Sequence, residues 1–189
     1  TLASYSPQQR EVLLVRGKYL TTAAGACGSC HSAVSSGIVG PGAVLSGGRL
    51  MTDQFGQVRA ANITPDRISG IGDWTVEDIA AAIRSSIAKS NKPISLDLHA
   101  GYRWLAEADT EAIAVYLLSL QPVRNDVERR DLGYFDRNKY GLMYRFSPVS
   151  GYVPRARSGA NAANGRYLAT NLSRCMVCHN RSGGMPENS

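Results

Sequence analysis

Cys27-Gly28-Ser29-Cys30-His31 and Cys175-Met176-Val177-Cys178-His179 share the form Cys-x-x-Cys-His. This pentapeptide is the attachment site of c-type haem, in which two thiols join one edge of the macrocycle and the adjacent histidine reaches the iron. All four cysteines of the chain lie in these two motifs, so none remains for a disulfide. The sequence therefore predicts two covalently bound c-type haems. The attachment residues are Cys27, Cys30, Cys175 and Cys178, and the proximal ligands are His31 and His179.

A structural zinc site is the main alternative for two Cys-x-x-Cys pairs, which then usually lie about 12–20 residues apart. Here the pairs begin 148 positions apart, and each is followed at once by histidine. A thioredoxin-like redox pair would need a βαβ context, which the hydrophobic pattern does not offer. Both alternatives are therefore disfavoured.

The formal net charge of +6 comes from the last third of the 189-residue chain. Residues 1–121 hold ten Lys or Arg and ten Asp or Glu, whereas residues 122–189 hold eleven against five. Such a basic region suits either docking on an acidic redox partner or neutralisation of haem propionates. The arginines are dispersed and accompany no nucleic-acid-binding motif, so nucleic acid is not an expected partner.

The expected location is the periplasm or the extracellular space, because covalent haem attachment is completed outside the cytoplasm. The longest apolar stretch, residues 113–120, is too short to span a bilayer. We therefore expect a cleaved leader before Thr1 and contact with a membrane only through a partner.

An internal repeat precedes the two haem motifs. Residues 17–22 read Gly-Lys-Tyr-Leu-Thr-Thr and residues 165–170 read Gly-Arg-Tyr-Leu-Ala-Thr, and each glycine lies ten positions before the first cysteine of its motif. The offset between the copies is 148 residues, which indicates a duplicated unit. Each copy is expected to begin with a helix that leads into the haem-binding loop.

Helical periodicity dominates the pattern and predicts a mainly α fold, with no convincing strand alternation. The first helix is expected to start at Ser6 and Pro7, and the second at Thr75. The third is expected to begin near Asp109 or Thr110 and to end before Pro122. Gly17 is expected to let the first and last of these helices cross closely near Tyr116. The predicted apolar face of the first helix consists of Val12, Leu13, Val15, Tyr19 and Leu20.

The predicted organisation is a class I cytochrome c domain with haem 1 at 1–121, a basic linker at 122–160, and an abbreviated second unit with haem 2 at 161–189. Only ten residues follow His179, whereas ninety positions separate His31 from Gln121. Either the chain is truncated, or the linker or another subunit completes the pocket of haem 2.

Three stretches outside the haem motifs resemble one family. They are Asn62-Ile63-Thr64-Pro65-Asp66, Gly70-Ile71-Gly72-Asp73-Trp74-Thr75 and residues 114–123, Ala-Val-Tyr-Leu-Leu-Ser-Leu-Gln-Pro-Val. Together with the haem motifs they resemble the multihaem cytochrome c subunits of membrane-bound bacterial alcohol, gluconate and aldehyde dehydrogenases. The resemblance implies a periplasmic electron carrier whose partners are redox proteins, such as a membrane-bound dehydrogenase or oxidase. It also implies that the carbonyl of Pro41 bonds the proximal imidazole.

The distal ligands are less determined by the sequence. The family places a Met-Pro pair shortly before the position of Tyr102, where this chain has no methionine. His99, the third of three histidines, is the expected sixth ligand of haem 1; a surface role, ligation of haem 2, and Met51 in its place remain alternatives. For haem 2 the candidates are Met185 and Met143, a ligand from another chain, or no sixth ligand.

Three functions follow from these alternatives. The leading one is electron transfer between a dehydrogenase or quinol donor and a downstream acceptor, with no catalysis by the chain itself. The second is a subunit of a larger respiratory complex or cytochrome polymer. In that case the protein is an oligomer, and a neighbouring chain completes haem 2. The third is a peroxidase-like haem enzyme with an open haem 2.

Overall fold

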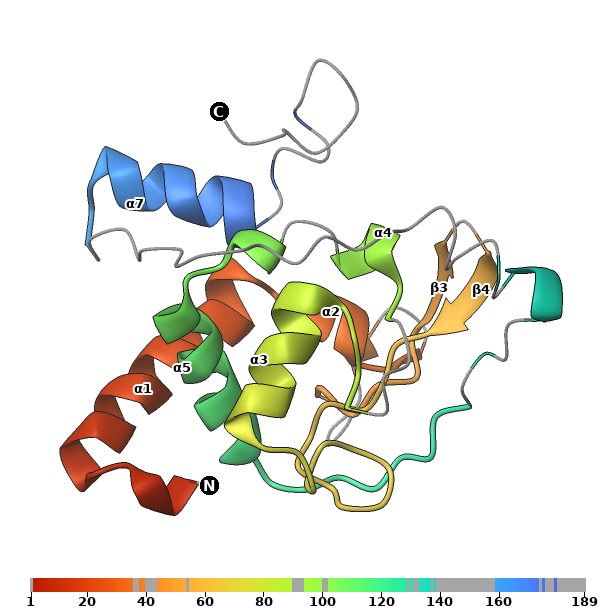
Figure 1. Ribbon diagram of the computed structural model, residues 1–189, viewed down its shortest axis with the longest axis horizontal. Coiled ribbons are helices and arrows are strands. Elements are labelled where there is room, and N and C mark those ends of the chain that lie inside the picture. Colours follow the sequence, from red (N-terminus) through yellow and green to blue (C-terminus); the bar gives the residue numbers. More distant parts are fainter. Residues whose placement is uncertain are drawn as a thin grey trace. The chain divides into compact units, whose positions relative to one another are not determined.

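The computed structural model describes residues 2–35, 38–39, 44–53, 55–89, 94–99, 102–128, 130, 133–136, 138, 159–173, 175 and 179. The chain divides into two compact units, whose elements can be followed in Figure 1. The first unit consists of Thr1–Ala26, Trp74–Tyr116 and Val149–Ser189. The second consists of Cys27–Asp73 and Leu117–Pro148. The second haem motif thus belongs to the unit that contains the N-terminal helix, and the first haem motif begins the other unit.

Helices make up the first unit, in agreement with the mainly α fold that the sequence predicts. In chain order they are η1 (Leu2–Ser4), α1 (Pro7–Tyr19), η2 (Leu20–Ala24), α3 (Val76–Ser85), α4 (Leu96–His99), η3 (Tyr102–Trp104), α5 (Glu107–Leu118, whose last two residues fall in the second unit), α7 (Ala162–Tyr167) and η4 (Leu168–Leu172).

Two helix starts are fixed by local side-chain caps, as the sequence predicts. The Ser6 hydroxyl accepts the backbone N–H of Gln9, and the Gln9 side chain accepts the N–H of Ser6. Thr75 and Asp78 form the same reciprocal pair at the start of α3. These capping boxes satisfy backbone donors that the first helical turn leaves without an intrahelical partner.

The start of α5 differs from the prediction: the helix begins at Glu107, ahead of the expected Asp109 or Thr110. The carbonyl of Ala106 accepts the backbone N–H of both Asp109 and Thr110, each at 3.0 Å. The first turn therefore forms around Ala106, and the two residues expected to begin the helix lie inside it.

A close crossing of α1 and α5 forms the core of this unit. A Cβ on Gly17 would lie 1.9 Å from the carbonyl oxygen of Ala112 and 2.7 Å from the Cβ of Tyr116, so only glycine fits. Beside the crossing, the Arg16 guanidinium donates two hydrogen bonds of 2.9 Å to the fully buried carboxylate of Asp109. Hydrogen bonding to that carboxylate raises the pKa of Arg16, which keeps the guanidinium positively charged. The predicted role of Gly17 is confirmed.

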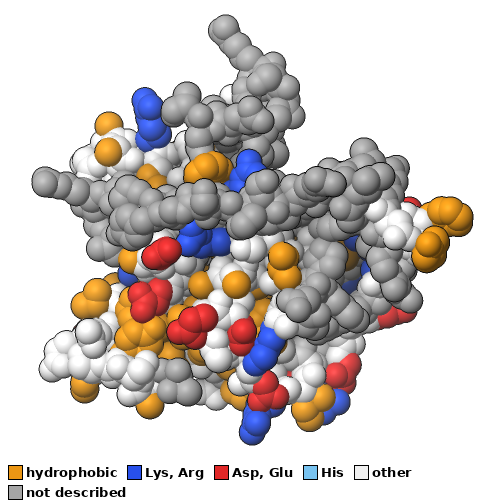
Figure 2. Space-filling model, in the orientation of Figure 1, with side chains coloured by type: hydrophobic (Ala, Val, Ile, Leu, Met, Phe, Trp, Pro, Cys, Tyr) orange, Lys and Arg blue, Asp and Glu red, His pale blue; other side chains and the backbone are white. Residues whose placement is uncertain are grey.

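The predicted apolar face is buried only in part: Leu20 is fully buried and Leu13 is half-buried. Val12 and Val15 are 66% and 68% exposed, and Tyr19 is 45% exposed. Figure 2 shows hydrophobic side chains at the surface in the region of α1 and α5. The helix turns its Gly17 side inward because the tight backbone contact and the Arg16 ion pair both require it.

The second copy of the repeat has the same backbone as the first, at the same offset. In each copy an α-helix ends in a π-helical turn, η2 at Leu20–Ala24 and η4 at Leu168–Leu172. Gly25 donates its N–H to the carbonyl of Leu20, and Ser173 donates its N–H to that of Leu168, both at 2.8 Å. The duplication inferred from the sequence is therefore present in the fold.

The second copy is built into the core of the first unit. Leu172 is 1% exposed, and its Cδ1 lies 3.0 Å from the place of a Cβ on Gly25. The Tyr167 hydroxyl accepts the backbone N–H of Ala106 at 3.0 Å, and the Asn171 amide donates to the Trp104 carbonyl at 3.1 Å. These contacts join α7 and η4 to the first copy and to the start of α5.

The second unit contains the short helix α2 (Gly28–His31) and two antiparallel hairpins. One pairs β1 (Val34–Ser35) with β2 (Ile38–Val39), and the other pairs β3 (Leu50–Asp53) with β4 (Gly56–Arg59). The sequence shows no convincing strand alternation, yet the structure contains these two short hairpins. Both faces of β3 and β4 are exposed or half-buried, so their sequences lack the apolar alternation that predicts a strand. A positive φ of 95° at Gly56 and the Arg130–Asp53 ion pair hold the second hairpin instead.

None of the helices in the described part of the chain has the length and apolar character needed to cross a bilayer.

Candidate haem-binding site

Helix α2 brings the three reactive side chains of the first motif to one face. Cys27 caps the helix, and its carbonyl accepts the N–H of Cys30 at 3.2 Å and that of His31 at 2.9 Å. Residues separated by three and four positions lie on the same side of a helix. The two thiols and the imidazole therefore point to the same side, as attachment and ligation of one haem require.

The His31 ring is fixed in one tautomer by a backbone carbonyl. Its Nδ1 lies 2.8 Å from the carbonyl oxygen of Ala61, which can only accept, so Nδ1 carries the proton. The lone pair is then on Nε2, the atom a proximal histidine offers to iron. Burial lowers the pKa of His31, while the bond to Ala61 opposes this, so the ring is neutral at pH 7. Burial also raises the pKa of the Cys27 thiol to about 11.

The backbone around α2 is held by the segment at residues 45–49. The N–H of Gly47 donates to the carbonyl of His31 at 2.7 Å, and the N–H of Leu45 donates to the Ser32 hydroxyl at 3.0 Å. The Arg49 guanidinium donates to the carbonyl of Ser29 inside the motif. These bonds fix the orientation of α2 relative to residues 45–49.

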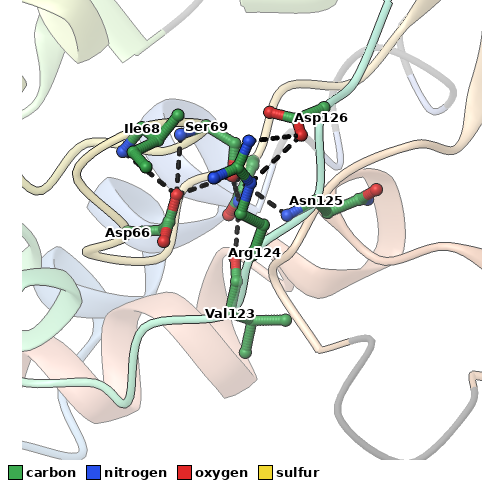
Figure 3. Close-up of polar contacts among 8 residues, drawn as sticks. Asp66, Ile68, Ser69, Val123, Arg124, Asn125 and Asp126 are labelled. Atoms are coloured by element: carbon green, nitrogen blue, oxygen red, sulfur yellow. Dashed lines mark hydrogen bonds and ion pairs between the residues drawn. The ribbon is translucent and has the colours of Figure 1, made fainter.

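A hydrogen-bonded network surrounds Asp66, the last residue of the Asn-Ile-Thr-Pro-Asp stretch (Figure 3). The Asp66 carboxylate accepts the backbone N–H of Ser69 and of Ile68 and the Ser69 hydroxyl, at 2.7 to 3.1 Å. The bond from the Ser69 backbone is the main reason that the pKa of Asp66 is lowered. The Ser69 oxygen in turn accepts the N–H of Asn125 at 3.0 Å. The loop is thereby tied to the segment that follows α5.

The first motif fits a c-type haem. It supplies two thiols and a neutral imidazole of fixed tautomer from one helical face. The Ala61 carbonyl accepts the ring N–H, as a carbonyl or carboxylate usually does for a metal-bound histidine. The second motif is only partly described: Cys175 and His179 are both exposed. Cys178 and its neighbours in the motif lie outside the described residues.

The structure describes two of the four candidate distal ligands, His99 and Met51. His99 ends α4 in the first unit, half-buried, with its ring edge-on to Tyr102 at a centroid distance of 5.5 Å. Met51 lies in β3 opposite Val58. Met143, Met185 and Pro41 lie outside the described residues. The acceptor found at the proximal imidazole is the carbonyl of Ala61 and not, as expected, that of Pro41. The assignment of His99, Met143 and Met185 as ligands therefore stays a prediction.

Sequence reasoning missed the role of Ala61, which lies thirty positions after His31. An alanine carbonyl gives no side-chain signal. The usable signal is its position directly before the Asn-Ile-Thr-Pro-Asp stretch, which carries the family resemblance.

Comparison with known proteins supports the resemblance. The chain is 31% identical over 178 residues to the gluconate 2-dehydrogenase cytochrome c subunit of Pantoea cypripedii, covering 91% of this chain and 39% of that protein. It is 31% identical over 167 residues to a diheme cytochrome c-type protein of Cereibacter sphaeroides, covering 86% and 55%. It is 27% identical over 187 residues to the cytochrome c subunit of the quinone alcohol dehydrogenase of Gluconobacter oxydans, covering 96% and 38%.

These matches cover most of the chain but only about two fifths to just over half of each of the three relatives. No family model matches the chain. Its relatives are cytochrome c subunits of dehydrogenases, together with a diheme cytochrome, and the resemblance stated from the sequence is confirmed.

Proposed function

We propose that this chain, a relative of dehydrogenase cytochrome c subunits, is a periplasmic electron carrier with two covalent c-type haems. Electrons would enter from a dehydrogenase or quinol and leave to a downstream acceptor. The observation that carries the proposal is the geometry of α2: Cys27, Cys30 and His31 share one face, and the Ala61 carbonyl fixes the tautomer of His31.

In this proposal the protein's own contribution is to keep the haem ligands in fixed positions. Once bound, a c-type haem supplies a one-electron couple. The bonds from Gly47 to the His31 carbonyl and from His31 to Ala61 restrain the proximal ring before and after an electron arrives. A ligand that does not have to move keeps the cost of reorganisation low, which suits an electron carrier.

The remaining ligands belong to the same proposal. His179 would be the proximal ligand of haem 2, attached through Cys175 and Cys178, and His99 the sixth ligand of haem 1. Replacing the family's methionine by histidine would lower the potential of haem 1, because methionine ligation raises it. Met185 and Met143 are the candidates for haem 2.

The experiment is a haem count on the chain expressed with a cytochrome c maturation system. The pyridine haemochrome assay should give two haems per chain for the wild type. The double variant Cys27→Ala, Cys30→Ala should bind one haem, and so should the double variant Cys175→Ala, Cys178→Ala. Near-infrared magnetic circular dichroism then identifies the axial ligands, and His99→Ala should remove a bis-histidine signal. A wild-type chain that binds no haem would refute the proposal. A high-spin signal in the native protein would favour the partner-completed or enzymatic alternative.

A further inference from the structure

The peptide between Ala61 and Asn62, whose carbonyl accepts the hydrogen bond from His31, is closely packed against Gly47. A Cβ on Gly47 would lie 2.5 Å from both the Ala61 carbonyl carbon and the Asn62 nitrogen, so the Gly47 backbone packs directly on this peptide. Gly47 has a φ of +80°, which favours glycine as well. On either side, Gly48 donates its N–H to Ala60 at 2.8 Å, and Ile63 donates its N–H to Leu45 at 3.0 Å.

The Asn62 side chain connects the same peptide to Val123, Ser69 and Thr64. Asn62 is 3% exposed. Its Nδ2 donates to the Val123 carbonyl at 2.8 Å and to the Ser69 hydroxyl at 3.1 Å. Its Oδ1 accepts the backbone N–H of Thr64 at 2.9 Å and the Thr64 hydroxyl at 2.7 Å. Both donors and both acceptor positions of the amide are used, which is the full capacity of an asparagine side chain.

The partners of Asn62 are also fully engaged. Thr64 gives its hydroxyl proton to Asn62 and accepts the N–H of Val123 at 3.1 Å. Ser69 gives its proton to Asp66 and accepts from Asn62 and from the backbone of Asn125 (Figure 3). A network in which each buried member is satisfied resists displacement, because moving one group leaves others unpaired at a cost.

We propose that Asn62 is a positioning residue for haem 1. It anchors the Ala61 carbonyl to the segment after α5, and thereby sets the strength and direction of the hydrogen bond to the proximal His31. A strong acceptor at Nδ1 makes the imidazole a more basic ligand and stabilises the oxidised iron. Loosening that acceptor should therefore raise the reduction potential of haem 1. The inference rests on the proposed haem function.

The primary test is Asn62→Ala in the haem-loaded chain, because alanine removes all four hydrogen bonds without adding charge. The potentials of both haems are measured in the same molecule, so haem 2 serves as an internal reference. Mutation of a residue that supports a metal ligand typically costs about 10–100-fold in metal affinity or activity. A tenfold change in the oxidised-to-reduced ratio is about 59 mV for one electron. We expect the potential of haem 1 to rise relative to that of haem 2.

Two further variants separate positioning from general stability. Ser69→Ala removes one acceptor of Asn62 and should give a smaller rise in the same direction. Thr110→Val removes buried hydrogen bonds in α5, to the carbonyls of Ala106 and Glu107, and should leave the potential of haem 1 unchanged. If Asn62→Ala fails to fold, Ser69→Ala carries the test.

A second readout is solvent exchange of the His31 Nδ1 proton, measured by NMR in the reduced protein. Faster exchange in Asn62→Ala or Ser69→Ala, together with the potential shift, supports the inference. Haem bound normally with an unchanged haem 1 potential and unchanged exchange would overturn the inference while leaving the proposed function standing. Failure of the wild-type chain to bind haem would instead refute the proposed function.

Discussion

The change Leu172→Ala tests whether the second copy of the repeat is part of the core of the first unit. Leu172 is 1% exposed, and its Cδ1 lies 3.0 Å from the place of a Cβ on Gly25, so a glycine lines the site. Glycine has no side chain that could fill the space left by the substitution. Leu→Ala changes in cores cost about 2–5 kcal/mol, with larger costs where the site cannot collapse. We therefore expect a loss of about 3–4 kcal/mol.

The assay is urea unfolding of the haem-loaded chain followed by far-UV circular dichroism, with thermal unfolding as a second measurement. For a chain of 150–250 residues, 1 kcal/mol corresponds to about 2–4 °C in Tm, so we expect Tm to fall by about 6–16 °C. Val15→Ala in α1 is the control, because Val15 is 68% exposed and should change stability by no more than about 0.5 kcal/mol. A Leu172→Ala variant as stable as this control would refute the view that α7 and η4 belong to the core.

Two further predictions concern the first unit. Gly17→Ala should destabilise the chain, because the added Cβ would lie 1.9 Å from the Ala112 carbonyl oxygen. This clash should outweigh the higher helix propensity of alanine. An increase in the urea concentration needed for unfolding would contradict the close crossing of α1 and α5. Burial and the hydrogen bond to Glu111 raise the pKa of Tyr5 to about 12. Because the unfolded chain ionises this phenol near pH 10, the contribution of Tyr5 to stability is complete below pH 10 and is lost between about pH 10 and 12. Stability should thus fall less steeply in Tyr5→Phe than in wild type over this range, and identical slopes would count against the shift.

The parts of the fold that depend on neighbouring residues could be predicted from the sequence. Ser6 with Pro7, and Thr75 with Asp78, specify their helix starts because a cap acts within four residues. The offset between the two copies of the repeat could be identified because Gly, Tyr, Leu and Thr occupy the same positions in residues 17–22 and 165–170. The glycine at position 17 pointed to a helix crossing because glycine inside a helix is otherwise unfavourable.

The parts that depend on distant contacts could not be predicted. The buried side of α1 is chosen by Ala112 and Asp109, far along the chain, so the apolar pattern of Val12 and Val15 misled. The exposed hairpin of β3 and β4 has no buried apolar face, so its hydrophobic pattern does not predict a strand.

The same limit applies to the site. The Cys-x-x-Cys-His motif by itself predicts the covalent attachment and the proximal ligand. The partner of His31 is a backbone carbonyl thirty residues away, and it is held there by Asn62 and the segment at residues 123–125. A carbonyl carries no residue-specific signal, so only the fold identifies it.

The most direct test of the central claim, that this chain is an electron carrier with two haems, is coulometric titration of the purified haem-loaded protein. We expect each chain to take up and return two electrons reversibly, one for each haem. Uptake of one electron or none per chain, or reduction that cannot be reversed, would contradict it.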